Sequence, residues 1–387
     1  MTRRICVVTT AHSSRSTRVF RKEACSLVAR GYDVTLIAQH IGGEMAGGVR
    51  IIPLPPVRTR LQRILGAGWR AFRLALRVRA DLYHFHDPEF LFWALILQRI
   101  TARPVIYDVH EFYADAVQTK AWIPRFLRRP ISFLVNLVEK SISRRLAGIV
   151  TVNLVMEGQF ARVNRNTTTV HNYPLREFVD RLASPTKRDP FAICYVGSVT
   201  ETRGLGVMIR AMRLVRRVEP AAHCRIIGPL RRVGGSDLAE SGMLQDAGIQ
   251  LIGEVPHAQV PDHLATCSIG WLPLLATGNY AKSTPVKLYE YMAARLPVVA
   301  SDMGLIAETV QRHRCGLLAE PGSAEAHAEA ILRLLAGPDE AWQMGERGRR
   351  AVLDRYLWET EVERMVTLYE RVLSAGWNSV AGRRKRT

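Results

Sequence analysis

Short apolar runs of strand length alternate with longer amphipathic segments along most of the chain. The first two apolar runs are residues 4–10 and 33–38, and the segment 17–30 between them predicts a helix. Gly31 ends this helix, because glycine readily adopts the left-handed conformation that closes a helix. A strand, a helix and a strand in this order predict parallel strands joined by a crossover helix. The pattern recurs, so we predict an α/β fold with doubly wound parallel sheets; further strands are expected at 147–152, 191–196 and 268–275.

The length of 387 residues favours two domains, each with its own core. Residues 180–190 are polar and contain proline, as is typical of a linker. We therefore predict an N-terminal Rossmann-like domain at 1–182 and a second Rossmann-like domain at 190–356. A terminal helix is expected at 358–375, followed by a basic tail at 380–387.

The hydrophobic content of 48% excludes a disordered chain, and no apolar run is long enough to span a membrane. The first residues lack the apolar region of a signal peptide, and six scattered cysteines form no C-x-x-C pair. These features predict a cytoplasmic protein with reduced thiols. Residues 1–186 contain 28 basic and 13 acidic residues, so most of the net charge of +19 lies in the first half. That half is expected to face an anionic surface or substrate.

Residues 58–79 predict a basic amphipathic helix, with apolar residues on one arc and arginines opposite. The simple interpretation is a helix that covers a sheet with its apolar face. The arginine face also suits an anionic membrane. Further arginines could join that contact, at positions 125, 128, 129, 144 and 145.

The richest segment chemically is 279–302, which predicts a loop, a helix and a buried strand, with Pro297 ending the helix. A helix N-terminus attracts phosphate, and Lys287 in the first turn adds a full positive charge. Glu290 lies three residues on, on the same face, where a carboxylate suits the two hydroxyls of a ribose. The segment therefore indicates a nucleotide site. The alternative is an ordinary amphipathic helix before a buried strand.

Other strand ends carry polar groups that parallel sheets bring to one edge. They are the loop 11–18, the segment His84–Glu89, and the pair His110 and Glu111. After the strand at 191–196, a glycine turn and Arg203 predict a second phosphate site. The chain has no G-x-G-x-x-G and no D-x-D, and its H-x-H-D does not complete a ligand set, so we predict no metal and no bound cofactor.

Five motifs in order carry a resemblance that covers nearly the whole chain. They are HDPE, YDVHE, G-S-x-x-x-x-R-G, G-x-V-P and S-x-P-x-K-x-x-E-Y-M-A-A. Together they resemble the retaining glycosyltransferases of family 4, in the bacterial branch that acts on polysaccharide or glycolipid precursors. The resemblance implies the GT-B fold, in which two Rossmann-like domains face each other across a cleft. It also implies that the helix 358–375 returns to the first domain.

The resemblance also implies roles for individual residues. The catalytic residues would be His110, which orients the sugar, Arg203 and Lys287, which hold the leaving diphosphate, and Glu290, which binds the ribose. The donor-binding residues would be Gly197, Ser198, Gly228, Val255, Ser283, Thr284, Pro285, Val286 and Leu288. The acceptor side would consist of Arg15, Arg18, His86, Asp87 and Glu111. Two positions depart from the family pattern: Lys282 replaces a glutamate, and Ser198 replaces a basic residue.

The implied reaction is a metal-independent transfer of a hexose from a nucleoside-diphosphate sugar to an acceptor hydroxyl, with retention. The expected acceptor is a saccharide or a lipid-linked saccharide at the inner face of the plasma membrane, with peripheral contact to anionic lipid. The alternatives are a sugar-nucleotide epimerase or a phosphorylase on the same fold, and a non-catalytic basic binding protein. A nucleic-acid partner is not expected, because no recognisable nucleic-acid motif accompanies the basic residues.

Overall fold

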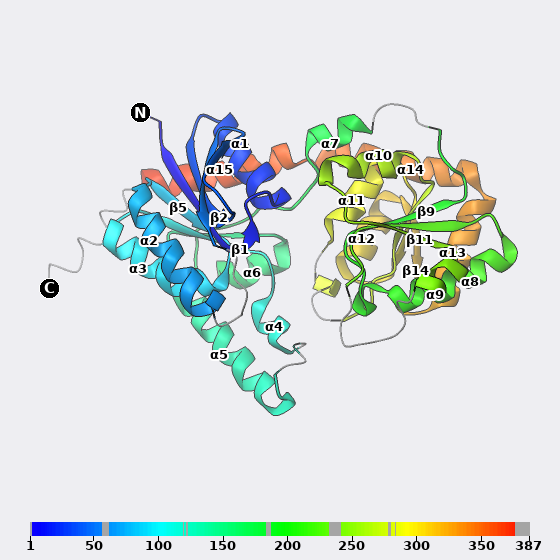
Figure 1. Cartoon of the computed structure of the whole chain (residues 1–387), viewed down its shortest axis with the longest axis horizontal. Helices are drawn as coiled ribbons and strands as arrows, with labels where there is room; N and C mark the ends of the chain where they lie inside the picture. The colour runs from blue at the N-terminus through cyan, green and yellow to red at the C-terminus, as the bar shows by residue number, and fades with distance from the viewer. Residues whose placement is uncertain are drawn as a thin grey trace. The chain divides into compact units, whose positions relative to one another are not determined.

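A computed structural model describes residues 2–55, 62–118, 120, 123–182, 187–231, 241–277, 280–282 and 284–375. The chain forms two compact units (Figure 1). Unit 1 contains the described residues up to Asn172 together with those from Glu359 onward, and unit 2 is Tyr173–Trp358. Each unit is a parallel sheet with helices on its faces, which confirms the predicted α/β class.

The sheet of unit 1 has the strand order β3-β4-β2-β1-β5-β6-β7-β8 over the described residues. All neighbouring strands are parallel except β3 and β4, which are antiparallel. Buried apolar side chains fill both faces of the central strands, as expected for a doubly wound sheet. The strands are β1 (Arg4–Ser13), β2 (Asp33–Gln39), β3 (Glu44–Ala46), β4 (Val49–Leu54), β5 (Leu82–Phe85), β6 (Val105–Val109), β7 (Gly148–Thr151) and β8 (Thr167–Thr169).

The helix expected at 17–30 is present but begins with π-helical winding, as η1 (Thr17–Ala24), and continues as α1 (Cys25–Ala29). The segment 58–79 is helical from Gln62 to Val78, as η2 and α2, and residues 58–61 lie outside the described residues. Of the two helices just named, η2 is Gln62–Ala67 and α2 is Gly68–Val78. The remaining helices of this unit are η3 (Pro88–Phe90), α3 (Leu91–Thr101), α4 (Tyr113–Gln118), α5 (Arg125–Ser143), α6 (Leu154–Ala161) and α15 (Trp358–Ser374).

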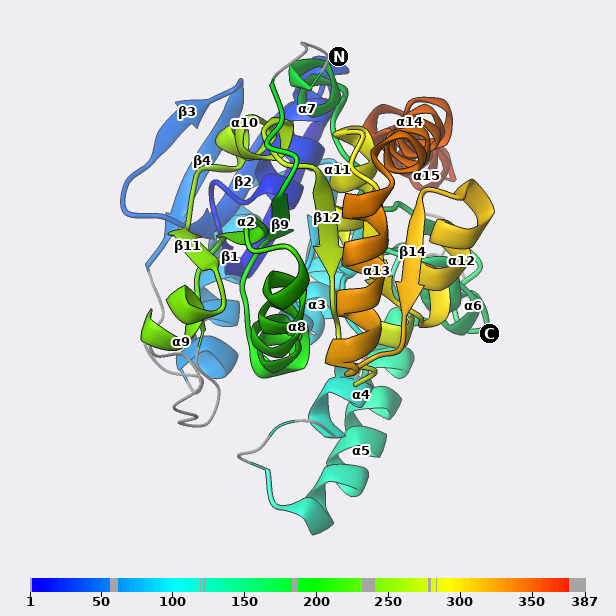
Figure 2. The ribbon, with the colours of Figure 1, turned by 90° about the vertical axis from the view of Figure 1, so that its right-hand side faces the viewer.

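Unit 2 contains a second parallel sheet, with the order β11-β10-β9-β12-β13-β14 (Figure 2). Its strands are β9 (Ala192–Val196), β10 (His223–Ile227), β11 (Ile249–Gly253), β12 (Ile269–Leu272), β13 (Val298–Ser301) and β14 (Gly316–Ala319). Its helices are α7 (Arg176–Arg181), η4 (Glu201–Arg203), α8 (Leu205–Val218), α9 (Ser241–Asp246), η6 (His257–Gln259), α10 (Val260–Ala265), η7 (Tyr280–Lys282), α11 (Val286–Ala293), α12 (Gly304–His313), α13 (Ala324–Ala336) and α14 (Pro338–Arg355).

The chain passes from unit 1 to unit 2 between Asn172 and Tyr173, earlier than the linker expected at 180–190. The physical reason is that α7 belongs to the core of unit 2, where Phe178 and Val179 are buried. Residues 183–186 of the expected linker and 376–387, which include the basic tail, lie outside the described residues.

The terminal helix α15 packs on unit 1. Glu361 accepts a hydrogen bond from the backbone N–H of His171 at 2.8 Å, and the Tyr369 hydroxyl is hydrogen-bonded to His84. Trp358, Val362, Met365 and Leu368 of this helix are fully or almost fully buried. Among the described residues, no helix is both long enough and apolar enough to cross a membrane.

Candidate active site

The strand orders place a topological switch point in each unit. In unit 1, β1 pairs with β2 on one side and β5 on the other. In unit 2, β9 pairs with β10 on one side and β12 on the other. Ligands of open parallel sheets bind at the carboxyl ends of strands at such points. The candidate residues of the sequence gather at these two places, as described below for each unit.

In unit 2, two glycines let the backbone turns at the ends of β9 and β10 approach each other closely. Gly197 has φ +105° and Gly228 has φ +149°, values that side-chain-bearing residues rarely adopt. A Cβ added at Gly228 would lie 2.4 Å from the carbonyl oxygen of Gly197. Both predicted donor-binding glycines are therefore required sterically by the shape of this edge of the sheet.

Lys287 reaches this edge from the first turn of α11. Its Nζ lies over the ring of Tyr195, 3.7 Å from the centroid, and a Cβ added at Gly197 would lie 3.3 Å from the same Nζ. Nζ is buried and makes no hydrogen bond to any described residue. Burial, and next the nearby Arg203, hold the pKa of Lys287 well below its ordinary value, although Glu290 opposes the shift. An anion that entered here would pair with the Lys287 amine, which is already desolvated.

Arg203 borders the same turn and is fixed by two hydrogen bonds. Its Nη1 donates to the carbonyl oxygen of Ser198 at 3.0 Å, and its Nε donates to the hydroxyl of Tyr280 at 3.1 Å. The hydroxyl of Tyr195 donates to the same Ser198 carbonyl at 3.0 Å. Arg203 and Lys287 thus lie beside one glycine turn.

Glu290 lies one turn further along α11 and is 5% exposed. Its Oε1 is paired with Nε2 of His257 at 3.0 Å, and the ring of Phe178 packs against that imidazole at 5.4 Å between centroids. His257 fixes the carboxylate through one oxygen. Among the described residues, no hydrogen bond or ion pair engages the second oxygen, so it is the one available to a ligand hydroxyl.

The other predicted donor-side residues occupy different environments. Pro285 is the N-cap of α11 and Val286 is its first residue, with Thr284 just before them. Leu288 is fully buried in the core of unit 2, and its backbone N–H donates to the carbonyl oxygen of Pro285 at 3.1 Å. Val255 packs against that core. Ser283 lies outside the described residues.

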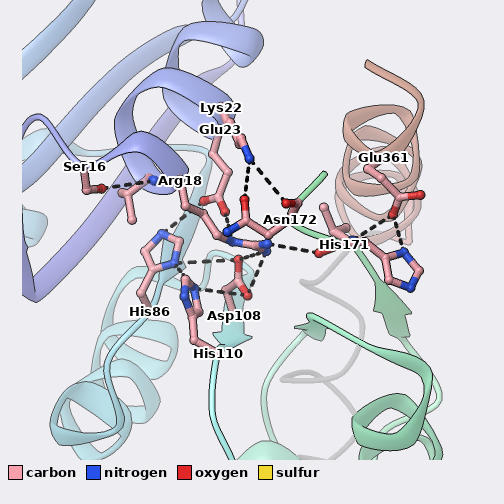
Figure 3. A network of polar contacts seen from close by, with 12 residues as sticks. Ser16, Arg18, Lys22, Glu23, His86, Asp108, His110, His171, Asn172 and Glu361 are labelled. Carbon is pink, nitrogen blue, oxygen red and sulfur yellow. Dashed lines mark hydrogen bonds and ion pairs between the residues drawn. The ribbon is translucent and has the colours of Figure 1, made fainter. Parts of the chain in front are cut away.

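In unit 1, a buried cluster forms where β1, β5 and β6 end (Figure 3). Asp108 of β6 is at its centre and is fully buried. Nη2 of Arg18 donates to Oδ2 of Asp108 at 3.1 Å, and Nε2 of His110 lies 3.4 Å from Oδ1. Nδ1 of His86 lies 3.7 Å from Oδ2. The predicted residues Arg18, His86 and His110 are therefore brought together around a carboxylate.

Glu23 completes the cluster because of the π-helical winding of η1. Residues five positions apart lie on one face of a π-helix, whereas an α-helix would point Arg18 and Glu23 in different directions. Nε of Arg18 is 2.9 Å from Oε1 of Glu23, and Nε2 of His86 is 3.3 Å from Oε2. Lys22, on the same face, donates to Oδ1 of Asn172 at 2.6 Å.

The pKa values of the buried groups in this cluster are shifted in different directions. Burial alone would raise the pKa of Asp108, but Arg18 and then His110 outweigh it and hold that pKa well below its usual range. Burial, together with the Asp108 charge, raises the pKa of Glu23 well above its usual range. Burial also lowers the pKa of His86. The cluster therefore favours the ionised form of Asp108, whereas it favours the protonated form of Glu23 and the neutral form of His86, all around the Arg18 cation.

His110 is held by one ring nitrogen. Its Nε2 is hydrogen-bonded to Nδ1 of His86 at 2.9 Å, and its ring lies 5.6 Å from that of His12. The described residues make no hydrogen bond to Nδ1 of His110, so this nitrogen is the one that could face a ligand. The histidine side chain is partly accessible, unlike the rest of the cluster.

The three remaining acceptor-side candidates do not join this cluster. Asp87 accepts hydrogen bonds from the Thr9 hydroxyl and the Thr10 N–H, both at 2.7 Å, so it fixes the end of β1. Arg15 is exposed and pairs with Glu44. Glu111 is exposed and lines a pocket of about 680 Å³ between α4, α5 and α6.

One ligand atom from each of four residues, Glu23, His86, Asp108 and His110, lies within 4.8 Å of the others, so these groups could hold a metal ion. Arg18 contacts both carboxylates and already supplies positive charge there. The sequence-based expectation of no metal stays a prediction.

Sequence reasoning missed three residues that complete the two clusters. Asp108 was visible within YDVHE, but nothing marked it as the centre of a network. Glu23 gave no signal, because the π-helical winding is not apparent in the sequence. His257 stands directly after the G-x-V-P motif, and that position was the one available clue.

Comparisons with known proteins match both halves of the chain. Residues 16–173 match the family described as Glycosyltransferase Family 4, and residues 190–337 match Glycosyl transferases group 1. The amylovoran biosynthesis glycosyltransferase AmsK of Erwinia amylovora is 35% identical over 151 residues, which are 38% of this chain and 37% of AmsK. The GDP-mannose-dependent alpha-(1-6)-phosphatidylinositol monomannoside mannosyltransferase of Mycobacterium tuberculosis (strain CDC 1551 / Oshkosh) is 28% identical over 178 residues, or 44% of this chain and 45% of that protein.

The matched part spans less than half the length of these curated relatives. Among solved structures, the crystal structure of Anabaena HepE in complex with UDP superimposes with a TM-score of 0.70 at 13% identity, covering 95% of this chain and 100% of HepE. Similarity at this level of identity shows the fold. The GT-B fold implied by the sequence motifs is confirmed.

Proposed function

We propose that this chain, a GT-B protein built from a Glycosyltransferase Family 4 domain and a Glycosyl transferases group 1 domain, moves a hexose from a nucleoside-diphosphate sugar to an acceptor hydroxyl with retention at the anomeric carbon. Unit 2 would bind the donor, and unit 1 would bind the acceptor and contact the transferred sugar. The HepE structure is a complex with UDP, which supports a nucleotide donor here.

The observation that carries the proposal is the buried Nζ of Lys287, which lies beside Arg203 at the end of β9 and has no hydrogen-bond partner among the described residues. A buried cation without a counter-ion is costly, and a diphosphate would supply the missing charge. Glu290, fixed by His257, would accept hydrogen bonds from the ribose hydroxyls. Phosphate and ribose groups side by side define a nucleotide, and the leaving group of the reaction is a nucleoside diphosphate.

In the proposed reaction, the bond between the anomeric carbon and the diphosphate oxygen breaks, and a bond from that carbon to the acceptor oxygen forms on the same face of the sugar. The acceptor proton passes to the departing phosphate oxygen. Arg203 and Lys287 stabilise the charge that develops on the diphosphate, which is the largest demand of the step. Cations fixed in advance can meet this demand without a metal ion.

His110 would act on the sugar through Nδ1, since its Nε2 is held by His86. In this position it would hydrogen-bond a sugar hydroxyl and orient the ring. The ionised Asp108 behind it favours positive charge on the oxocarbenium-like sugar. Arg18 and Glu23 would serve as positioning residues for this pair.

The acceptor is proposed to be a saccharide or a lipid-linked saccharide at the inner face of the plasma membrane. AmsK is named for amylovoran biosynthesis, and the mycobacterial relative is named for a phosphatidylinositol mannoside. Such names describe those proteins and support the same acceptor classes here. The basic first half of the chain suits an anionic lipid surface.

The experiment is to measure nucleoside diphosphate release from UDP-, GDP-, ADP- and dTDP-sugars, with and without a membrane lipid extract. Release from one donor that rises with extract would name the donor and place the acceptor in the lipid phase. The anomeric configuration of the product, read by NMR, tests retention. No release and no binding with any donor would refute the proposal.

Variants Lys287→Ala, Arg203→Ala and Glu290→Ala test the site. We expect the first two to lower kcat about 10²–10³-fold, as for loss of one group that stabilises transition-state charge. Glu290→Ala should weaken donor binding. Arg213, an exposed arginine on α8, provides the matched control as Arg213→Ala. Wild-type kinetics in the three site variants would refute the site assignment.

A further inference from the structure

Helix α5 of unit 1 buries polar residues and exposes large apolar ones, the reverse of the usual amphipathic pattern. Its buried residues are Ser132, Glu139 and Ser143, which are all polar. Its exposed side chains include Phe126, which is 77% exposed, and Phe133, which is 70% exposed. The other exposed apolar side chains of this helix are Leu127, Leu134, Leu137 and Val138.

The polar inner face is fixed by specific hydrogen bonds. The hydroxyl of Tyr107 donates to Oε1 of Glu139 at 2.9 Å, and the hydroxyl of Ser132 donates to the carbonyl oxygen of Ala114 at 2.7 Å. These bonds determine which side of α5 faces the unit. The helix cannot rotate its apolar side chains inward without losing them, so the apolar face is directed outward by the fold itself.

The exposed apolar residues form one continuous stripe. Phe126, Phe133 and Leu137 are spaced by seven and four residues, and so are Leu127, Leu134 and Val138. Such spacing places both sets on adjoining lines of one helix face. The stripe covers about 18 Å along the axis at 1.5 Å per residue. Both views show the N-terminal part of α5, with α4 beside it, projecting from the sheet of this unit (Figures 1 and 2).

The charges on and around α5 favour one kind of partner. Glu139 is the one acidic residue in the helix, and it is buried. Arg125 and Arg129 are exposed at the N-terminal end, and Arg144 and Arg145 are exposed just beyond Ser143. The apolar stripe therefore has cations at both ends and no exposed acid on the helix. Pairing of two copies through this face would bring arginines against arginines or leave them unpaired.

We infer that the α5 stripe is a membrane-docking face, which lies in the surface of an anionic phospholipid bilayer. The phenylalanine and leucine side chains enter the boundary between headgroups and acyl chains, and the flanking arginines pair with lipid phosphates. Docking of this kind needs no membrane-spanning helix. It differs from the docking expected for the arginine face at 58–79, because the apolar contact comes from α5.

The same helix connects this face to the pocket between α4, α5 and α6. Phe133 belongs to both the stripe and the pocket, and Glu111, the residue after His110, lines the pocket too. Arg129 and Lys140 of α5 line it as well. An acceptor carried by a lipid in the docked bilayer would thus be presented beside His110. This link rests on the proposed function, whereas docking itself does not.

The test is flotation of the full chain with vesicles of phosphatidylcholine alone and with equimolar phosphatidylglycerol and phosphatidylcholine. We expect binding to the mixed vesicles and little to phosphatidylcholine. The triple variant Phe126→Ser, Phe133→Ser and Leu137→Ser should lose at least about tenfold in partitioning, because each buried aromatic or aliphatic side chain contributes severalfold. Replacement of the four flanking arginines by glutamine, at positions 125, 129, 144 and 145, should weaken the preference for the anionic vesicles.

The matched control replaces exposed apolar residues of unit 2, as Trp342→Ser with Val218→Ser, and should bind like the wild type. Circular dichroism checks that each variant is folded. Wild-type binding by the triple variant would overturn the inference, and so would a dimer in sedimentation that the triple variant abolishes. If the triple variant loses vesicle binding while no variant or wild type releases nucleoside diphosphate, docking stands and the proposed function fails.

Discussion

Replacement of Lys287 by methionine should stabilise the ligand-free protein and remove its response to nucleoside diphosphate. Methionine has nearly the same length but no charge, so it fills the space over the Tyr195 ring. A buried polar or charged group without a partner costs about 1–3 kcal/mol. We therefore expect the free energy of unfolding of unit 2 to rise by about 1–3 kcal/mol, or Tm to rise by about 2–4 °C per kcal/mol.

The sign of the pH dependence follows from the lowered pKa of Lys287. In the unfolded chain this lysine is protonated below its ordinary pKa of 10.5, whereas the folded protein binds that proton less readily. The penalty on the folded state is therefore largest at low pH and disappears as the pH rises towards 10.5. The advantage of Lys287→Met over the wild type should shrink over the same range.

A bound diphosphate reverses the effect, because it favours the protonated lysine. Donor binding should therefore take up a proton wherever Lys287 is neutral in the free protein, and affinity should fall as pH rises there. Calorimetry in buffers with different ionisation enthalpies measures this uptake. Thermal unfolding with and without the diphosphate supplies the stability comparison, with the exposed Lys187→Met as control.

The reasoning is refuted by either of two results. One is a ligand-free Lys287→Met protein that is less stable than the wild type at neutral pH. The other is equal stabilisation of Lys287→Met and wild type by nucleoside diphosphate, which would mean that the diphosphate does not contact this amine.

Three further predictions concern the two clusters and the metal. Asp108→Asn should lower the free energy of unfolding by about 3–5 kcal/mol in urea, because it removes the ionised partner of the buried Arg18. Glu23→Gln should cost far less, since burial and Asp108 raise the pKa of Glu23 and so favour its uncharged form. His257→Ala should weaken donor binding about tenfold by freeing the Glu290 carboxylate, with kcat nearly unchanged, as steady-state kinetics would reveal. EDTA should leave nucleoside diphosphate release unchanged; a loss that added divalent metal restores would assign an ion to the four-residue cluster of unit 1.

Local patterns in the sequence determined the class of the fold and part of the donor site. Alternation of apolar runs and helical segments is a short-range property, and it predicted the parallel α/β arrangement and a terminal helix at 358–375, which the structure shows as Trp358–Ser374. Lys287 and Glu290 are three residues apart on one helix, so their shared face follows from helical geometry alone. The motifs added Arg203 and His110, and the structure brings Arg203 to the same glycine turn as Lys287.

Tertiary structure alone decided the features that depend on distant or irregular contacts. Asp108 became the centre of a network because three strands end beside one another, and Glu23 joined it because η1 winds as a π-helix. His257 meets Glu290 across 33 positions of sequence. Phe133 is exposed and Ser132 is buried because the inner face of α5 is held by hydrogen bonds such as that of Ser132, which hydropathy alone does not reveal. Sequence patterns record how residues repeat along the chain, whereas such contacts depend on which segments the fold brings together.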